Sequence, residues 1–147
     1  MPFNPNIHHR RSIRLRGYDY SRAGLYFITI CCERRGNPLW LPFGKIENKD
    51  MILNDAGKMI ETEWVALITR FQNIELHEYI VMPNHFHRVL QIVGGISVVA
   101  QNDGATTRVA PTKTIGDMMD AFKSKTTVEY IRGVKTFGWQ RFDGKLW

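Results

Sequence analysis

The chain has 147 residues, of which 44% are hydrophobic and 23% are charged, and its formal net charge at pH 7 is +6. This length fits a single domain and this composition can form a buried core, so disorder of the whole chain is excluded. The longest apolar runs fall far short of the ~20 residues that cross a membrane, and no apolar signal core follows the N-terminus, so we expect a cytoplasmic protein that does not span a membrane.

The positive charge is concentrated at the two ends of the chain. Residues 1–22 contain five Arg and one Asp, residues 23–103 contain seven basic and nine acidic residues, and residues 104–147 contain eight basic and four acidic residues. Basic ends around a near-neutral middle suit a surface that binds a polyanion such as a nucleic acid. Scattered solubilising charge is the alternative that the count leaves open.

The first third of the chain is predicted to contain a basic arm and short strands. Residues 1–23 are arginine-rich and turn-prone, which predicts an irregular arm. Residues 24–32, with the sequence GLYFITICC, are rich in β-branched and aromatic side chains and predict a buried strand. After a turn at 36–38, one or two short strands are expected within 45–53.

The middle of the chain is predicted to form a helix followed by two strands. Apolar residues recur at intervals of three and four over 55–71, which predicts an amphipathic helix with Asn54 or Asp55 as its N-cap. Residues 75–82 and 85–93 are predicted strands. The Pro-Asn dipeptide between them marks either the turn of a hairpin or a kink in one continuous strand.

The last third is predicted to contain a loop, a helix and a basic, aromatic tail. Residues 94–113 are small and polar, which predicts a long flexible loop, and residues 114–131 have the periodicity of a second helix. The order strand, helix, strand, strand, helix predicts an α+β fold, with an antiparallel sheet covered by helices mainly on one face. We expect residues 1–147 to form one domain.

His85 and His87 are the clearest candidates for a functional site. Residues i and i+2 of a strand point to the same face, so both imidazoles would lie side by side while Phe86 faces the core. Two neutral imidazoles on one face can hold a divalent metal ion, with other positions left for a third ligand or for substrate oxygens. Two surface histidines without a metal are the alternative.

Two further roles at such a site can be considered from the sequence. Glu75, His77 and Tyr79 alternate along the preceding strand and would share one face, so Glu75 or His77 would add a metal ligand or orient one if that face matches. A tyrosine can attack a phosphate beside a metal ion, and Tyr130 is the only tyrosine after the histidine pair. Its place at the edge of an apolar helix face is nevertheless typical of a packing residue.

The candidate DNA contacts come from the two basic ends of the chain. Clustered cations can hold phosphates, and the tryptophans between them, Trp40, Trp139 and Trp147, can stack on bases, although core packing explains each tryptophan equally well. The candidate contacts are Arg10, Arg11, Arg14, Arg16, Lys123, Lys125, Arg132 and Arg141.

Several segments, taken in order, resemble the single-tyrosine HUH transposases and especially their REP-associated relatives. The segments are RRSIRLRGYDY at residues 10–20, YFITICC, LNDAGKMIETEW, VMPNHFH followed by an apolar strand, FKSKTT and KLW. Together they cover nearly the whole chain except for the loop at 94–113. A chain of matched segments is far more specific than the His-x-His pattern alone.

The resemblance implies a ferredoxin-like or palm-like α+β fold and a protein of DNA transposition that cuts and rejoins single-stranded DNA, often beside short hairpins, with Mg²⁺ or Mn²⁺. His85 and His87 match the HUH pair that binds the metal. In the family, a tyrosine on a C-terminal helix attacks the scissile phosphate and forms a 5′-phosphotyrosine, and a polar residue four positions later is the third ligand. Family members are often dimers, so a homodimer is also implied.

The chain departs from the family pattern at the nucleophile and at one core position. In REP-associated relatives, the tryptophan that matches Trp147 is followed by a W-Q-R-x-Y-x-E-H segment and later by the nucleophile in a Y-I-x-x-N-P motif, and neither segment is present. Tyr130 belongs to an earlier helix and Val134, four residues later, cannot bind a metal, so the role is not transferred to Tyr130. Arg88 stands where relatives have a small or apolar residue.

Three functional hypotheses follow. The first is a transposase-family protein whose tyrosine helix is missing from this chain, so that it binds metal and DNA but cuts DNA negligibly. The second is a non-catalytic module that recognises DNA hairpins. The third is a metal-dependent phosphodiesterase that uses metal-bound water, which has little support because few carboxylates can be placed near the histidine pair.

Overall fold

The computed structural model of the chain describes residues 14–33, 37, 39–94 and 113–147. Most of the predicted arm and loop, at 1–13 and 95–112, lies outside the described residues. The described elements, in chain order, are the strands β1 (Gly24–Cys31), β2 (Gly44–Glu47) and β3 (Asp50–Leu53), the helix α1 (Asp55–Val65) with the short 3₁₀ helix η1 (Ala66–Thr69), the strands β4 (Ile74–Met82) and β5 (His85–Ile92), and the helix α2 (Ile115–Phe137).

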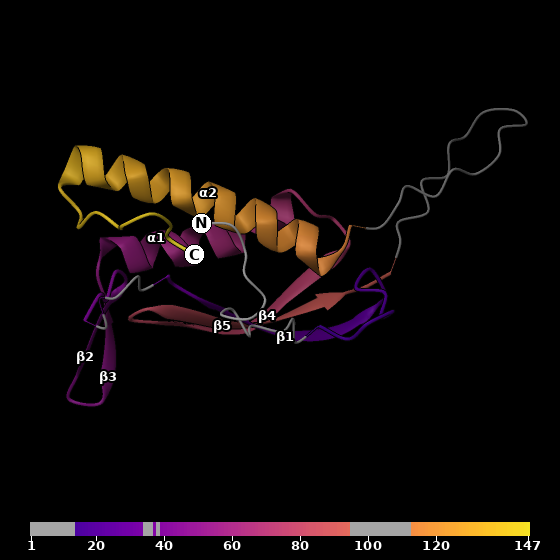
Figure 1. Cartoon of the computed structure of the whole chain (residues 1–147). Coiled ribbons are helices and arrows are strands. Elements are labelled where there is room, and N and C mark those ends of the chain that lie inside the picture. The colour runs from indigo at the N-terminus through magenta and orange to yellow at the C-terminus, as the bar shows by residue number, and fades with distance from the viewer. Residues whose placement is uncertain (1–13, 34–36, 38, 95–112) are drawn as a thin grey trace, which may run out of the picture.

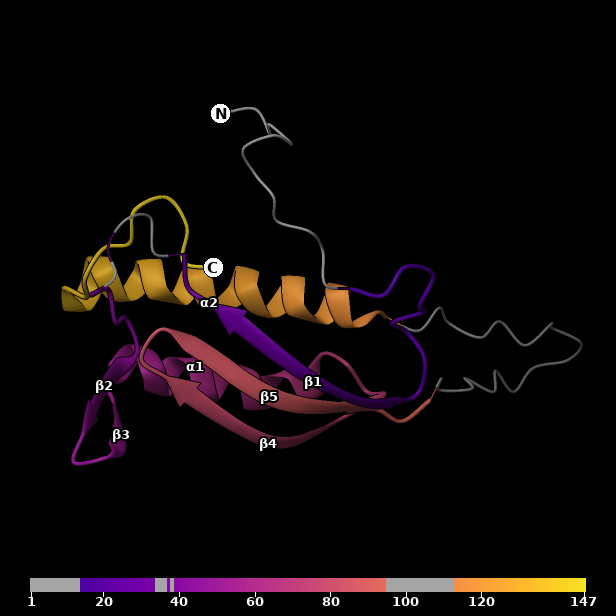
Figure 2. The same ribbon diagram turned by 60° about the horizontal axis from the view of Figure 1, so that its bottom comes forward.

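Two helices lie on one face of a three-stranded antiparallel sheet (Figures 1 and 2). The strand order is β1-β5-β4, so β5 is the central strand and both of its neighbours run antiparallel to it. β2 and β3 form a separate two-stranded hairpin. The α+β class and the helices on one face are therefore confirmed, and the arrangement is compatible with the fold that the family resemblance implies. Neither described helix has the length and apolarity that a membrane crossing requires.

β4 and β5 form a hairpin, so Pro83 and Asn84 are its turn and not a kink in one continuous strand. Its turn is held by main-chain hydrogen bonds from two other segments: the Pro83 carbonyl accepts from the Phe43 N–H at 3.0 Å, and the Asn84 carbonyl accepts from the Cys32 N–H at 2.9 Å. The turn is thus fixed to the end of β1 and to the segment before β2. This contact matters because β5 begins directly after the turn, at His85.

α1 begins at one of the two N-cap residues that the sequence predicts, and α2 begins at a capping box that was not predicted. The Asn54 side chain accepts a hydrogen bond from the Gly57 N–H at 2.9 Å and so caps α1, and Thr114 forms a capping box with Asp117 at the start of α2. The α-helical part of the predicted helix 55–71 ends at Val65, because the chain tightens there into a 3₁₀ turn that keeps Leu67 buried.

α2 extends six residues beyond the predicted end at Ile131. A glycine within a helix costs about 1 kcal/mol relative to alanine, so Gly133 weakens the helical signal in the sequence. In the structure the ring of Trp139 occupies the place where a side chain at position 133 would lie. The helix ends at Gly138, which has the left-handed conformation (φ 71°) common at helix C-termini.

The core between the helices and the sheet contains a ring cluster with an arginine inside it. Trp64 of α1, Phe86 of β5 and Phe122 of α2 have ring centroids 5.6–6.0 Å apart. The guanidinium carbon of Arg88 lies 4.8–5.2 Å from these three ring centroids, and its side chain is buried. The charge at position 88 therefore faces the core, as expected from its place on the strand.

Candidate functional site

β5 presents His85 and His87 on the face of the sheet opposite the helices. Side chains alternate along this strand: Phe86, Arg88, Leu90 and Ile92 are buried, whereas the residues between them are half-buried. The ring centroids of His85 and His87 lie 4.8 Å apart, with the ring planes at 82° to each other. The predicted placement of both imidazoles on one face, away from the core, is confirmed.

Neighbouring side chains orient both rings. His85 Nδ1 lies 2.8 Å from Asn84 Oδ1, and His87 Nδ1 lies 2.8 Å from Thr29 Oγ1. An amide oxygen only accepts hydrogen bonds, so this contact suits the tautomer of a neutral His85 ring that carries its hydrogen on Nδ1 and its lone pair on Nε2. Thr29 favours the same tautomer of His87 when its hydroxyl accepts. Hydrogen bonds of this kind hold metal-binding histidines with Nε2 directed at the metal.

Thr29 and Asn84 were not among the candidates from the sequence. Asn84 has a local signal, since it stands directly before His85 in a turn. Thr29 has none, because it lies 58 residues from His87 in the chain and only the pairing of β1 with β5 places the two opposite each other. On the same strand, the exposed ring of Phe27 stacks on His87 with a centroid distance of 5.7 Å.

The expected third ligand from β4 does not reach the histidine pair. Glu75 is opposite Gln91, four residues along β5 from His87, which is about 13 Å at the usual rise of a strand. His77 Nε2 lies 2.9 Å from Gln91 Oε1 and is thus held at the same distant end. Within the described part of the chain, no three His, Cys, Asp or Glu side chains are grouped to hold a metal ion.

A β-bulge in β4 changes which residues share a face. The register with β5 shifts between Leu76 and Tyr79. As a result Tyr79 lies opposite Arg88, and its ring meets Phe86 on the core side at 6.0 Å, whereas Glu75 lies on the histidine side. The expectation that Glu75, His77 and Tyr79 share one face is wrong, because the extra residue of a bulge reverses the alternation.

Tyr130 is a packing residue. Its side chain is 1% exposed, its hydroxyl donates to the Gln140 carbonyl at 2.8 Å, and its ring contacts Trp139 and Phe142. Burial raises the pKa of its hydroxyl to about 12. It also lies on α2, which covers one face of the sheet (Figure 2), whereas the alternation along β5 directs His85 and His87 to the other face. These surroundings do not suit an attacking group.

The remaining tyrosines also lie away from the histidine pair. Tyr26 is opposite the buried Leu90 and so faces the helix side of the sheet, and the rings of Tyr18 and Tyr20 pack on it with centroid distances of 6.5 and 6.3 Å. The Tyr20 carbonyl accepts from the Ile115 N–H at the start of α2. The chain has five tyrosines, and the structure therefore brings none of them to His85 and His87.

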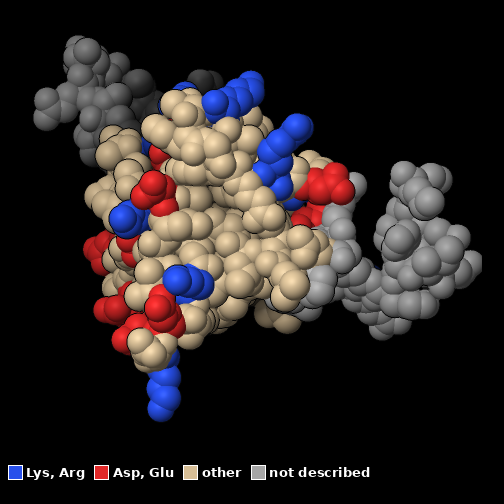
Figure 3. Space-filling model, turned by 90° about the vertical axis from the view of Figure 1, so that its left-hand side faces the viewer, with Lys and Arg blue, Asp and Glu red and all other residues tan. Residues whose placement is uncertain are grey.

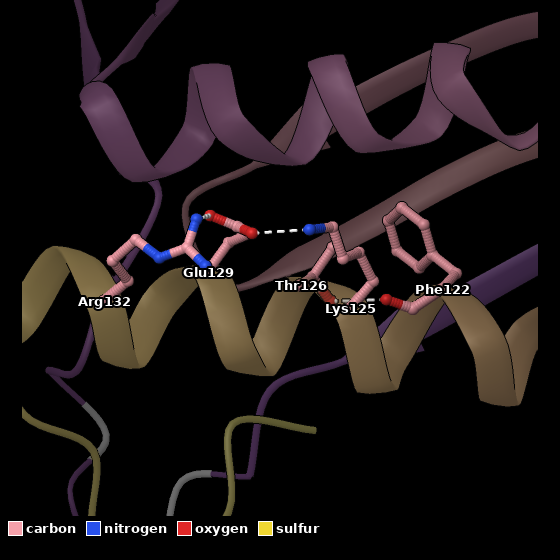
Figure 4. Close-up of polar contacts among 5 residues, drawn as sticks. All are labelled: Phe122, Lys125, Thr126, Glu129 and Arg132. Atoms are coloured by element: carbon pink, nitrogen blue, oxygen red, sulfur yellow. Dashed lines mark hydrogen bonds and ion pairs between the residues drawn. The ribbon is translucent and has the colours of Figure 1, made fainter.

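The candidate DNA contacts differ in their surroundings, and some of them already pair with a carboxylate or an aromatic ring of this chain. Lys125 and Arg132 both pair with Glu129, with N–O distances of 2.6 and 2.9 Å, and these contacts hold the pKa of that carboxyl below its usual value (Figure 4). Two of the eight candidate cations are therefore partly neutralised within α2. The Arg14 guanidinium lies over the Tyr20 ring at 6.0 Å.

The other candidates are spread over the molecule. Arg16 is exposed, Lys123 is half-buried on α2, and Arg141 lines a cavity beside the end of α2. Arg10 and Arg11 lie outside the described residues.

The tryptophans have packing roles. Trp40 is 5% exposed, the indole N–H of Trp147 donates to Thr126 Oγ1 at 2.9 Å, and the ring of Trp139 covers Gly133. Core packing, the alternative that the sequence left open, thus accounts for all three residues.

The comparisons with known proteins show one clear relationship. No family model matches the chain. A protein of Haemophilus influenzae, described as an uncharacterized protein, is 34% identical to it over 145 residues, which cover 95% of this chain and 78% of the relative. The match extends over nearly the whole of this sequence. This chain belongs to the same family as the Haemophilus influenzae protein.

Proposed function

We propose that this protein binds single-stranded or hairpin DNA over a divalent metal ion held by His85 and His87, as a member of the single-tyrosine HUH transposase class that its sequence resembles. The observation that supports this most is the histidine pair itself. Two imidazoles lie 4.8 Å apart on a sheet face without helices, and both Nδ1 atoms are engaged by neighbouring side chains.

The donor set fits Mn²⁺ better than Mg²⁺. Imidazole nitrogens bind first-row transition metals well, whereas Mg²⁺ prefers oxygen ligands. Two protein ligands leave positions for water and for phosphate oxygens of a DNA strand. A metal bound there would polarise a phosphate oxygen. Thr29 and Asn84 would keep both rings in the binding orientation, and the fixed turn at Pro83 would keep β5 in place.

Strand cleavage through a phosphotyrosine needs a tyrosine close to the metal. The tyrosines of this chain pack elsewhere, so we expect these 147 residues to bind DNA rather than to cut it. In a homodimer, a partner copy of the same sequence would bring the same tyrosines in the same packed positions. The proposal therefore assigns metal and DNA binding, and not strand cleavage, to these residues.

Metal binding can be tested directly. We expect Mn²⁺ titration, followed by electron paramagnetic resonance or calorimetry, to show one site that weakens at least tenfold in His87→Ala. Thr29→Val, which removes only the hydrogen bond to the ring, should weaken binding by about tenfold, and by less than His87→Ala does. His77→Ala is the matched control, because His77 is on the same face but is held by Gln91. Equal Mn²⁺ affinity in His87→Ala and wild type would refute the metal site.

A non-catalytic hairpin-binding module is the second candidate. It is favoured by the lack, within the described residues, of a third ligand or a tyrosine at the histidine pair. Its affinity for a hairpin oligonucleotide would be salt-sensitive but unchanged by EDTA or by His87→Ala. A loss of affinity on chelation would instead support the metal-dependent proposal. Release of hydrolysed DNA without a protein adduct would indicate the phosphodiesterase hypothesis.

A further inference from the structure

A groove beside the end of α2 combines two cations with an apolar floor. We call it the C-terminal groove. Its volume is about 560 Å³, and it lies between the last turns of α2 and the segment that returns along the helix. The lining residues are Ile131, Val134, Lys135, Arg141, Phe142 and Gly144.

The returning segment is anchored at both ends, so the groove has fixed walls. After α2 ends at Gly138, the ring of Trp139 packs on Gly133, and the Gln140 carbonyl accepts the hydroxyl of Tyr130. Further on, Leu146 is buried and its carbonyl accepts from the Glu33 N–H at 3.1 Å. The residues between these anchors, 141–145, return beside α2 (Figure 1), and Arg141, Phe142 and Gly144 among them line the groove.

The cations of the groove differ from the others on α2. Lys125 and Arg132 share the carboxylate of Glu129, whereas no carboxylate of the described residues lies within ion-pair distance of Lys135 or Arg141. Figure 3 faces the end of the molecule where α2 terminates: Lys and Arg side chains stand around a wide uncharged surface, most acidic side chains lie along the left edge, and others lie beside the cations at the right. An anion is therefore the complementary ligand for the groove.

We propose that the C-terminal groove binds one nucleotide of a single DNA strand, with Lys135 and Arg141 holding the flanking phosphates and the base lying against Phe142 and the apolar floor. Cations beside an aromatic ring are what a sequence-tolerant single-strand site requires. Inorganic phosphate would leave the apolar floor unused, and a neutral apolar ligand would leave both charges unused. This inference rests on the proposed DNA-binding function and adds a contact away from the histidine pair.

The phosphate contacts are tested by the salt dependence of DNA binding. A labelled single-stranded oligonucleotide is titrated by fluorescence anisotropy at several KCl concentrations. Each phosphate held contributes about 0.7 to the slope of log K against log salt for single strands, so Lys135→Gln/Arg141→Gln should make the slope shallower by about 1.4. Lys49→Gln/Arg70→Gln removes the same charge at two exposed positions that do not line the groove and should leave the slope near that of wild type. An equal change in both variants would overturn the proposal.

The floor is tested by a carboxylate placed inside the groove. Ile131→Asp puts a negative charge on the floor at a position that is 38% exposed, so the fold should tolerate it. We expect at least a tenfold loss of DNA affinity. Thr136→Asp, an exposed position of the same helix that does not line the groove, is the matched control and should stay close to wild type. Circular dichroism verifies that both variants are folded, and equal DNA affinities for the two would contradict the proposal.

The two proposals fail in different ways. If Mn²⁺ binds through His87 but the groove variants bind DNA with the wild-type salt slope, the groove inference is wrong and the metal site stands. The opposite result is that the groove variants lose slope and affinity, while His87→Ala leaves the Mn²⁺ affinity unchanged and EDTA leaves the DNA affinity unchanged. In that case the groove stands and the metal site is wrong. Mn²⁺ affinity should be the same in Ile131→Asp and in wild type.

Discussion

Arg88, one residue after His87, turns a charged side chain into the core. The guanidinium contacts Met119 Sδ, but Nε and Nη1 are buried without a hydrogen-bond partner in the described structure. Burial lowers the pKa of Arg88 to about 9, so the core disfavours the charged form. Each buried donor without a partner costs about 1–3 kcal/mol, and each desolvated cation–ring contact contributes about 2 kcal/mol, so the two donors and the three ring contacts have effects of similar size. The desolvation of the charge itself is a further cost, and it is the cause of the lowered pKa.

Replacing this charge should stabilise the protein. Arg88→Met fills a similar volume without a charge, and we expect the free energy of unfolding to rise by about 1–4 kcal/mol, the range seen when buried charges give way to apolar side chains. Urea denaturation measures the change. Arg70→Met, which removes an exposed arginine, should have an effect within about 0.5 kcal/mol. A less stable Arg88→Met would mean that the ring contacts of the guanidinium outweigh its burial.

At the scale of elements, the packing of the C-terminal segment decides how far α2 extends. Trp139 packs where a side chain at position 133 would lie, and the main-chain N–H groups of Gly138 and Trp139 bond to the Gly133 carbonyl. The glycine that weakens the helical pattern is thus required by a residue beyond the end of the helix. The bulge in β4 is a similar case, because its effect on Tyr79 depends on pairing with β5.

A side chain at position 133 should therefore destabilise the protein. Gly133→Ala gains about 1 kcal/mol of helix propensity, but overpacking against the Trp139 ring costs about 1–3 kcal/mol, so we expect a net loss of stability in thermal or urea unfolding. Gly116→Ala is the control, since a Cβ there meets only Thr114 and Arg14 atoms at 3.4 Å or more. Unchanged stability of Gly133→Ala would show that Trp139 moves aside easily.

At the scale of the whole molecule, the sheet separates the histidine pair from the tyrosines. His85 and His87 lie on the face without helices, whereas Tyr26, Tyr79 and Tyr130 face the side that α1 and α2 cover. A hydroxyl cannot attack a phosphate across a packed sheet. This arrangement is the reason that we assign binding, and not cleavage, to these residues.

The separation predicts no covalent product. Incubation of the protein with Mn²⁺ and a single-stranded hairpin oligonucleotide should give no protein–DNA adduct on a denaturing gel, while the same mixture shows binding by anisotropy. A robust adduct that is lost in Tyr130→Phe would revive Tyr130 as the nucleophile and contradict the packed position described above.

The site could be predicted from the sequence in part. The spacing of His85 and His87 is local, and the two-residue period of a strand is enough to place both rings on one face. The third ligand could not be predicted this way, because the position of Glu75 and His77 relative to the pair depends on the register between β4 and β5. The pairing of Lys125 and Arg132 with Glu129 could also be predicted, because Glu129 lies four residues after Lys125 and three before Arg132 on one helix, and side chains at these spacings meet.

By itself, the sequence determined the order of the elements, the α+β class, the N-cap of α1 and the histidine pair, since each depends on residues close together in the chain. The tertiary structure decided what depends on distant residues: Thr29 beside His87, the bulge that turns Tyr79 to the core, the burial of Tyr130 and the groove that Arg141 shares with Lys135. Local periodicity can specify which face of a strand or helix a side chain occupies. Only packing specifies which residues from other elements meet it there.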